Sequence, residues 1–193
     1  MDGPFANTTL HIDQIWGVDY YDDYCLARSW NQTAYLTANQ SYVDICRAKD
    51  NYNDANFCYV DNPHSCGHLA TGGTVSSSPS YLQMEDQNAS PGDPVFFLHH
   101  ANLDRLWWLW QKDNLTARLT DMSGSIIPPE SIMQQNRWLY PSAAFIDYDG
   151  DAGNDTTLNH VLWMANIIPN VTIAEVMDLN GDMICAEYIE PDE

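Results

Sequence analysis

The longest hydrophobic run of the chain lies between Pro94 and Lys112 and contains no helix breaker. Asp93 and Pro94 suit the start of a helix, because a carboxylate can cap free backbone amides and proline fits the first helical position. The run is apolar on nearly every side, which is typical of a helix buried inside a bundle. We therefore predict that residues 94–112 form the central helix of the fold.

Weaker patterns predict the other elements. Helical spacing of apolar residues predicts helices over residues 33–49, 64–70, 129–140 and 172–177. We expect a strand over residues 183–189. Segments rich in Gly, Pro, Asn, Asp or Ser predict extended chain or loops over residues 1–32, with a surface loop at 19–24, and over 74–92 and 147–155, and residues 50–63 are a polar stretch. No repeat or domain-sized linker divides the chain.

Composition and charge narrow the class of protein. With 45% hydrophobic and 12% aromatic residues, a chain of 193 residues can fill a core, which argues against a disordered or fibrous protein. Seven Lys and Arg residues against 27 Asp and Glu residues give a formal net charge of -20. Such a charge repels phosphate backbones and anionic lipid surfaces, so we expect neither nucleic acid nor a membrane as a partner.

Seven Asn-X-Ser/Thr triplets, the acceptor motif for N-glycosylation, are spread along the chain, where roughly two would arise by chance. They begin at Asn7, Asn31, Asn39, Asn88, Asn114, Asn154 and Asn170. This excess favours a secreted glycoprotein; the alternative is an Asn-rich surface with accidental hydroxyls. The opening segment MDGPFANTTL has no apolar run, so we expect that a leader was removed or that the chain is a piece of a larger protein.

Five cysteines fit the same oxidising compartment. Cys46 and Cys58 are close in sequence, which favours a disulfide between them and leaves Cys25 to pair with Cys185. Three pairings are open for these four residues, and free core thiols are the other interpretation. Cys66 is left over, and we expect it to lie in the core.

Four of the six histidines fall in two short clusters, His64 with His68 and His99 with His100. Residues four apart on a helix lie on one face about 5 to 6 Å apart, so His64 and His68 can direct their imidazoles to one point. His99 and His100 point about 100° apart on the predicted central helix, so only one of them reaches that point easily. For the first pair alone, capped or exposed histidines without a metal are an equally good interpretation.

We select His100 as the third ligand. Phe96 lies one turn before it and Asp104 one turn after it, which provides an aromatic wall and a carboxylate able to hold the imidazole by its other nitrogen. His99 then packs beside the site, although the reverse assignment stays open. Three neutral imidazoles suit copper, zinc or iron. A zinc hydrolase is a weaker interpretation, because the chain has no HExxH arrangement.

The run DPVFFLHHANLDRLWWLWQ, residues 93–111, resembles the second-copper signature of tyrosinases, catechol oxidases and molluscan-type hemocyanins. PHSCGH at residues 63–68 occupies the place of the first two ligands, and DGPFA at residues 2–6 resembles the segment between the two copper regions. CLARSW at residues 25–30 resembles a nearby Leu-x-Arg element, and TTLNHVLWM at residues 156–164 is similar to the tails of fungal members. The resemblance covers nearly the whole chain.

By this resemblance the chain is mainly α, the second-copper half of a tyrosinase-like four-helix copper bundle with long loops and a short C-terminal strand. His64, His68 and His100 would bind one copper ion of a coupled pair that binds O2 and oxidises phenols or o-diphenols to quinones. The resemblance also implies supporting roles around these ligands for Asp104, Arg105, Phe96, Phe97 and His99.

The resemblance further implies a first copper site with three more upstream histidines, but only His11 precedes His64. We therefore expect residues 1–193 to be a single tyrosinase copper-binding domain, truncated at its N-terminus, that holds one of the two copper ions of an intact member. Its expected partners are a small phenol, O2 and the missing first-copper half, without which we expect little oxidase activity. Because hemocyanins share the signature, a non-catalytic copper-binding or O2-binding glycoprotein is the alternative.

Overall fold

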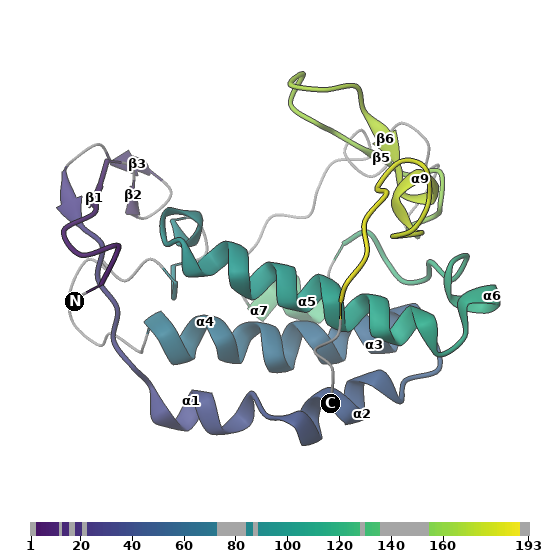
Figure 1. The fold of residues 1–193 in the computed structure, drawn as a ribbon, viewed down its shortest axis with the longest axis horizontal. Coiled ribbons are helices and arrows are strands. Elements are labelled where there is room, and N and C mark those ends of the chain that lie inside the picture. The colour runs from purple at the N-terminus through teal and green to yellow at the C-terminus, as the bar shows by residue number, and fades with distance from the viewer. Residues whose placement is uncertain are drawn as a thin grey trace. The chain divides into compact units, whose positions relative to one another are not determined.

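The computed structural model describes residues 3–11, 13–15, 18–20, 23–72, 84–86, 89–127, 130–135 and 155–189. Within these ranges the chain is mainly helical with a few short strands, which confirms the predicted fold class (Figure 1). It forms two compact units, one made of Met1–Ala48 and Asn56–Trp107 and the other of Lys49–Ala55 and Trp108–Glu193. The single domain stays a prediction.

None of the described helices is long and apolar enough to cross a bilayer.

The first unit opens with two small antiparallel strand pairs. Strand β1 (Thr9–Leu10) pairs with β4 (Tyr24–Cys25), with Thr9 opposite Cys25. Strand β2 (Asp13–Ile15) pairs with β3 (Val18–Tyr20). The prediction of a surface loop over residues 19–24 was therefore wrong at both of its ends, because backbone pairing with neighbouring segments recruits these residues into strands.

Two helices occupy the place of the single helix predicted over residues 33–49. Helix α1 spans Gln32–Thr37 and helix α2 spans Gln40–Arg47. The Oδ1 atom of Asn39 accepts hydrogen bonds from the backbone N–H groups of Ser41 and Tyr42 at 2.9 and 3.3 Å. An asparagine that caps free amides in this way begins a new helix rather than continuing the old one, so the predicted helix is interrupted here.

Helix α3 (Tyr52–Tyr59) was missed by the sequence analysis, which found only a polar stretch there. The Oδ1 atom of Asn51 accepts the Asp54 backbone N–H at 3.0 Å, so a polar residue of this stretch caps the helix. A π-helical turn, η1 (Val60–His64), follows and is kinked at Asn62, where φ is -128° and ψ is 140°. Proline disfavours the helical conformation in the residue before it, which explains the extended backbone there.

Helices α4 (Ser65–Gly72) and α5 (Val95–Lys112) confirm the two helices predicted around the histidine clusters. A short 3-10 turn, η2 (Ser90–Gly92), precedes α5, and the Asp93 side chain accepts the Val95 N–H at 2.9 Å. Helix α4 lies between α1 and α5 (Figure 1).

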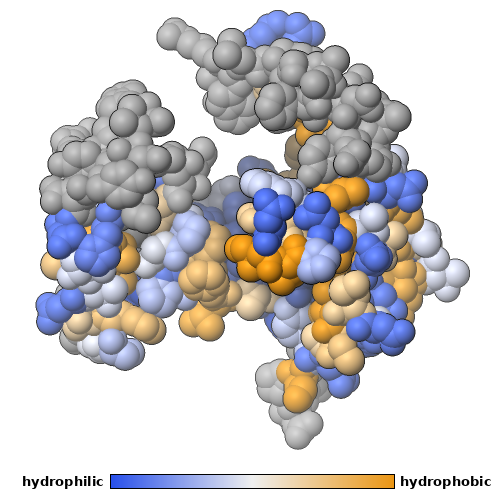
Figure 2. Space-filling model, turned by 90° about the horizontal axis from the view of Figure 1, so that it is seen from above, coloured by the Kyte–Doolittle hydropathy of each residue, from blue (hydrophilic) through white to orange (hydrophobic). Residues whose placement is uncertain are grey.

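Helix α5 is less buried than its composition predicted. Phe97 and Leu98 on its first turn are 62% and 73% exposed. The described residues therefore leave this part of the helix uncovered. Hydrophobic side chains are also visible elsewhere on the surface of the molecule (Figure 2).

A disulfide and a buried ion pair fasten the first unit. Cys46 and Cys58 form the predicted local disulfide, which joins α2 to α3. Arg28 donates two hydrogen bonds of 2.7 Å to Asp93, a carboxylate that is fully buried. Cys25 and Cys185 are exposed free thiols, so the second predicted disulfide was wrong. Each of these two residues is held by its own local backbone bonds, in β4 and in the turn after Gly181.

The second unit packs around Trp110, which is fully buried. The Trp110 indole donates to the Lys49 carbonyl oxygen at 2.8 Å, and the Arg118 guanidinium lies 4.4 Å over the indole ring. The other elements that the structure describes in this unit are α6 (Leu115–Arg118), α7 (Glu130–Gln135), β5 (Val161–Leu162), β6 (Val171–Thr172) and α9 (Ile173–Val176). Strands β5 and β6 are antiparallel.

Three predictions fall on this unit. Helix α9 confirms the helix over 172–177, with a capping box between Thr172 and Glu175. Helix α7 confirms the first part of the helix over 129–140, whose residues 136–140 lie outside the described residues. The strand over 183–189 was wrong: the N–H groups of Cys185 and Ala186 donate to carbonyls a few residues earlier, which makes a local turn.

Candidate metal centre

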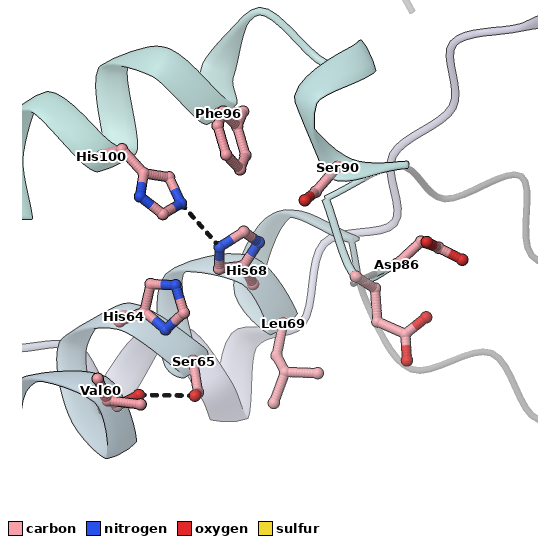
Figure 3. Close-up of a pocket in the computed structure, with 10 residues that line it drawn as sticks. Val60, His64, Ser65, His68, Leu69, Asp86, Ser90, Phe96 and His100 are labelled. Carbon is pink, nitrogen blue, oxygen red and sulfur yellow. Dashed lines mark hydrogen bonds between the residues drawn. The ribbon is translucent and has the colours of Figure 1, made fainter. Parts of the chain in front are cut away.

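Three histidines from neighbouring segments converge on one point (Figure 3). His64 ends η1, His68 lies one turn later in α4, and His100 lies in α5. One ring nitrogen of each lies within 4.8 Å of the other two, and the Nε2 atoms of His68 and His100 are 3.3 Å apart. The structure thus brings together the three histidines that the sequence analysis selected as candidate ligands.

The His68 ring is oriented by a backbone carbonyl. Its Nδ1 atom lies 2.6 Å from the carbonyl oxygen of Met84, which can only accept a hydrogen bond. Nδ1 therefore carries the proton, and the lone pair of Nε2 faces His100 and the centre of the group. The sequence analysis missed this partner, because a main-chain oxygen leaves no signal in the side-chain pattern.

The other two ligands are held in the neutral form. Burial lowers the pKa of both His64 and His100, and the positive charge that His68 would carry lowers it further. Neutral imidazole is the form that binds metal ions. The Nδ1 atom of His64 is buried and has no hydrogen-bond partner among the described residues. An unpaired buried nitrogen is expected where an ion or another group completes a site.

These residues fit a copper ion. Three imidazoles without thiolate or carboxylate are within the ligand preference of copper. Their ring nitrogens lie within 4.8 Å of one another, close enough for the three to share an ion. Cys66 is not part of the group, because its Sγ atom donates to the Asn62 Oδ1 at 2.8 Å.

His99 supports the ligands instead of joining them. Its Nε2–H donates to the backbone carbonyl oxygen of His64 at 3.0 Å, and its ring stacks on the His64 ring with centroids 5.7 Å apart. Burial lowers the pKa of His99 to about 4, with the His68 charge adding to the effect. The structure therefore groups His100, and not His99, with His64 and His68.

The His99 ring lies against Gly67, where a side chain would block it. A Cβ atom on Gly67 would lie 2.2 Å from Cε1 of His99, far inside contact distance. The sequence analysis missed Gly67, although a glycine between two candidate ligands was a usable signal, since glycine weakens a helix unless something must approach closely.

The other predicted supporting residues divide into two groups. The Phe96 ring lies 4.1 Å from the His100 ring and provides the predicted aromatic wall. Phe97 contacts Phe96 but is 62% exposed, so its implied packing around the ligands was wrong: its position on the helix turns it outward. Asp104 is exposed, and Arg105 donates to Asn102 at 3.3 Å. The roles of Asp104 and Arg105 toward the ligands stay predictions.

A cavity of about 640 Å³ opens beside the three histidines, large enough for a small aromatic molecule. It is lined by Val60, His64, Ser65, His68, Leu69, Glu85, Asp86, Ser90, Phe96 and His100. Two carboxylates lie in this lining, and neither was a candidate in the sequence analysis, because a lone Glu-Asp pair in a polar loop carries no recognisable spacing.

Comparison with known proteins agrees with this geometry. Residues 1–113 match the family model described as tyrosinase, common central domain of tyrosinase. The chain is 27% identical to the tyrosinase-like protein phomQ1' of Diaporthe leptostromiformis over 97% of its length and 46% of that protein. It is 26% identical to the tyrosinase ustQ of Aspergillus flavus, covering 97% of this chain and 44% of that one. The chain thus spans about half the length of the curated relatives it matches.

A solved structure shows the same fold. The polyphenol oxidase of Thermothelomyces thermophila, a G292N mutant, superposes with a TM-score of 0.63 at 21% identity, over 97% of this chain and 50% of that one. The family model covers more than half of the 193 residues. The chain therefore belongs to the tyrosinase family.

Proposed function

We propose that the chain binds one copper ion through His64, His68 and His100 and acts as the second-copper half of an oxidase that converts phenols or o-diphenols to quinones. The observation that carries this proposal is the convergence of three ring nitrogens within 4.8 Å in a member of the tyrosinase family. When bound, copper would supply the one-electron redox change and the affinity for O2.

The residues around the triad have separate tasks in this proposal. The Met84 carbonyl and His99 fix the orientation of His68 and the backbone of His64, so little reorganisation is needed when an ion binds. Phe96 packs against His100 and excludes water from one side of the ligand ring. The cavity beside the triad accepts the phenol ring.

A single copper ion limits what the chain does alone. Oxidation of a catechol to a quinone removes two electrons, whereas one copper ion cycling between its cuprous and cupric states accepts one. The chain has six histidines, and besides the triad and His99 only His11 and His160 remain, which is too few for a second triad. We expect oxidation to require a second copper site on another polypeptide segment.

Copper titration with a catechol assay tests the proposal. We expect one copper per chain and little quinone formation, with activity appearing when a first-copper half of a tyrosinase is added. Robust turnover at one copper per monomer would refute the half-site proposal. Reversible oxygenation without turnover in the assembled protein would favour an O2-binding role.

Secretion and glycosylation are part of the same proposal. Asn7, Asn39, Asn114 and Asn170 are exposed, Asn31 is half-buried, and Asn88 and Asn154 lie outside the described residues. The disulfide between Cys46 and Cys58 suits an oxidising compartment. A loss of mass after endoglycosidase treatment of protein from a eukaryotic host would support this; an unglycosylated, retained protein would contradict it.

A further inference from the structure

The cavity beside the triad is negatively charged along one side. Among the described residues, its lining contains the carboxylates of Glu85 and Asp86 and no Lys or Arg. In Figure 3 the three histidines lie at one end of the cavity and Asp86 lies at the other, beyond Ser90 and Leu69. A phenol whose ring lies at the triad would therefore place a ring substituent near the acidic end of the cavity, which is formed by Glu85 and Asp86.

The segment that carries these carboxylates is fixed relative to the triad. The Met84 carbonyl accepts the His68 Nδ1–H at 2.6 Å, and Met84 is fully buried. Gly72 at the end of α4 lets this segment approach closely, because a Cβ there would lie 2.3 Å from the Glu85 backbone nitrogen. The acidic end thus keeps a defined place beside the ligand His68.

The two carboxylates differ in their availability. The Oδ1 atom of Asp86 accepts the Ala89 backbone N–H at 2.7 Å, so this side chain also shapes the turn before η2. Glu85 has no hydrogen bond or ion pair within the described part of the chain and is half-buried at the cavity. Glu85 is therefore the carboxylate better able to meet a ligand.

The carboxylates of the described lining have no cation beside them in it. Glu85 and Asp86 give this lining a formal charge of about -2 at neutral pH. Asp93 does not add to this charge, because Arg28 pairs with it. A charge of this size raises the local concentration of cations and lowers that of anions.

We propose that this cavity selects cationic phenols, in which an ammonium group on a short chain accompanies the phenol or catechol ring, and that Glu85 is the residue that determines this selectivity. The inference rests on the proposed function, because it takes the triad as the place where the ring binds. Carboxylate-bearing phenols are disfavoured by the same charges.

Binding to the zinc-loaded chain tests the selectivity without turnover, since zinc shares the imidazole preference and has no redox chemistry. The probes are tyramine, neutral para-ethylphenol and anionic para-hydroxyphenylacetate, titrated by calorimetry at low salt. We expect tyramine to bind about tenfold more tightly than para-hydroxyphenylacetate, with the ratio falling toward one in high salt.

Substitutions assign the effect to a residue. Glu85→Gln should reduce the tyramine preference at least about threefold, and Glu85→Lys should reverse it. Asp86→Asn should have a smaller effect, and Asp61→Asn, an exposed residue outside the cavity lining, is the matched control for net charge. Thermal unfolding of each variant verifies the fold.

The outcomes separate this inference from the proposed function. Zinc or copper that fails to bind the triad refutes the proposed function. Metal binding followed by equal affinity for the three probes, or by an unchanged preference in Glu85→Gln, overturns the cationic-phenol proposal alone. Metal binding without binding of any probe overturns that proposal together with the phenol site of the proposed function.

Discussion

The Nε2–H group of His99 donates to the backbone carbonyl oxygen of His64 at 3.0 Å. A residue of α5 next to the candidate ligand His100 thus holds the backbone of His64, the last residue of η1 before α4. The two helices are thereby fixed at the level where their imidazoles converge. The next residue, His100, keeps a ring nitrogen close to those of His64 and His68.

Removal of the His99 side chain should weaken copper binding without removing a ligand. We expect His99→Ala to lower copper affinity about tenfold to a hundredfold, the range typical of lost supporting hydrogen bonds. His99→Gln should recover much of this loss, because its side-chain amide can donate at similar reach. Competition titration with a chelator of known affinity measures the copper affinity of both variants. Equal affinities for wild type and His99→Ala would show that the contact does not position His64.

Gly67→Ala should disturb the His99–His64 hydrogen bond, because Gly67 packs against the His99 ring. The new methyl group collides with the His99 ring, and we expect a loss of about 1 to 3 kcal/mol in the free energy of unfolding. In a His99→Ala background most of this loss should vanish, which urea unfolding of the two single variants and the double variant would detect.

The control for this cycle is Gly181→Ala, whose methyl group would meet the Asp178 carbonyl oxygen at 3.1 Å and not the His99 ring. Its effect on stability should be the same in both backgrounds. Additive losses for Gly67→Ala and His99→Ala would contradict the predicted collision.

The metal-free protein should lose stability as the pH falls from 7 toward 5. The pKa of His99 is lowered to about 4 in the folded state, so the unfolded chain takes up a proton near pH 6.5 while the folded chain does not. The stability that this residue contributes is full above pH 6.5 and is lost as the pH falls toward 4, by about 1 to 2 kcal/mol after solvent screening. His64, His68 and His100 surround it, and the lowered pKa of His64 and of His100 acts in the same direction.

Urea unfolding at pH 7, 6 and 5 in the presence of a chelator measures this dependence. His99→Gln should flatten the curve, since its amide does not titrate. The lowered pKa of Glu175 contributes only below about pH 4.5, outside this window. Stability that rises between pH 7 and 5 would contradict burial of neutral histidines.

The disulfide between Cys46 and Cys58 should stabilise the first unit. It closes a loop of 12 residues, for which chain entropy predicts a contribution of about 2 to 3 kcal/mol. A Cys46→Ser, Cys58→Ser double variant should lose about this amount in chemical unfolding. Cys25→Ser, which replaces an exposed free thiol, is the matched control and should change little; equal losses would argue against the disulfide.

Much of the candidate site was predictable, because it depends on local properties of the sequence. These are a separation of four residues between two histidines on a helix and a capping residue at the start of the long apolar helix. Asp93 and the run after it predicted α5 nearly to the residue, and the separation of His64 from His68 predicted a shared face. Features that depend on how distant segments meet were not predictable. The Met84 carbonyl, the space beside Gly67 and the carboxylate of Glu85 become part of the site only through packing of α4 on segments far along the chain.

Errors in the fold have similar physical causes. The helix expected over 33–49 divides because Asn39 caps a new helix. The polar stretch before Pro63 forms α3, whose first turn is capped by Asn51. Cys25 and Cys185 were paired on compartment and count alone, and these do not determine which cysteines of a chain are bonded.

Copper binding by single-histidine variants tests the central claim most directly. We expect the wild-type chain to bind one copper, with an electron paramagnetic resonance spectrum showing three nitrogen ligands, and His64→Ala, His68→Ala and His100→Ala each to lower affinity by more than about a hundredfold. His160→Ala, outside the triad, should bind copper as the wild type does. Undiminished copper binding by all three triad variants, or loss of copper on replacing His160, would contradict a copper centre made by His64, His68 and His100.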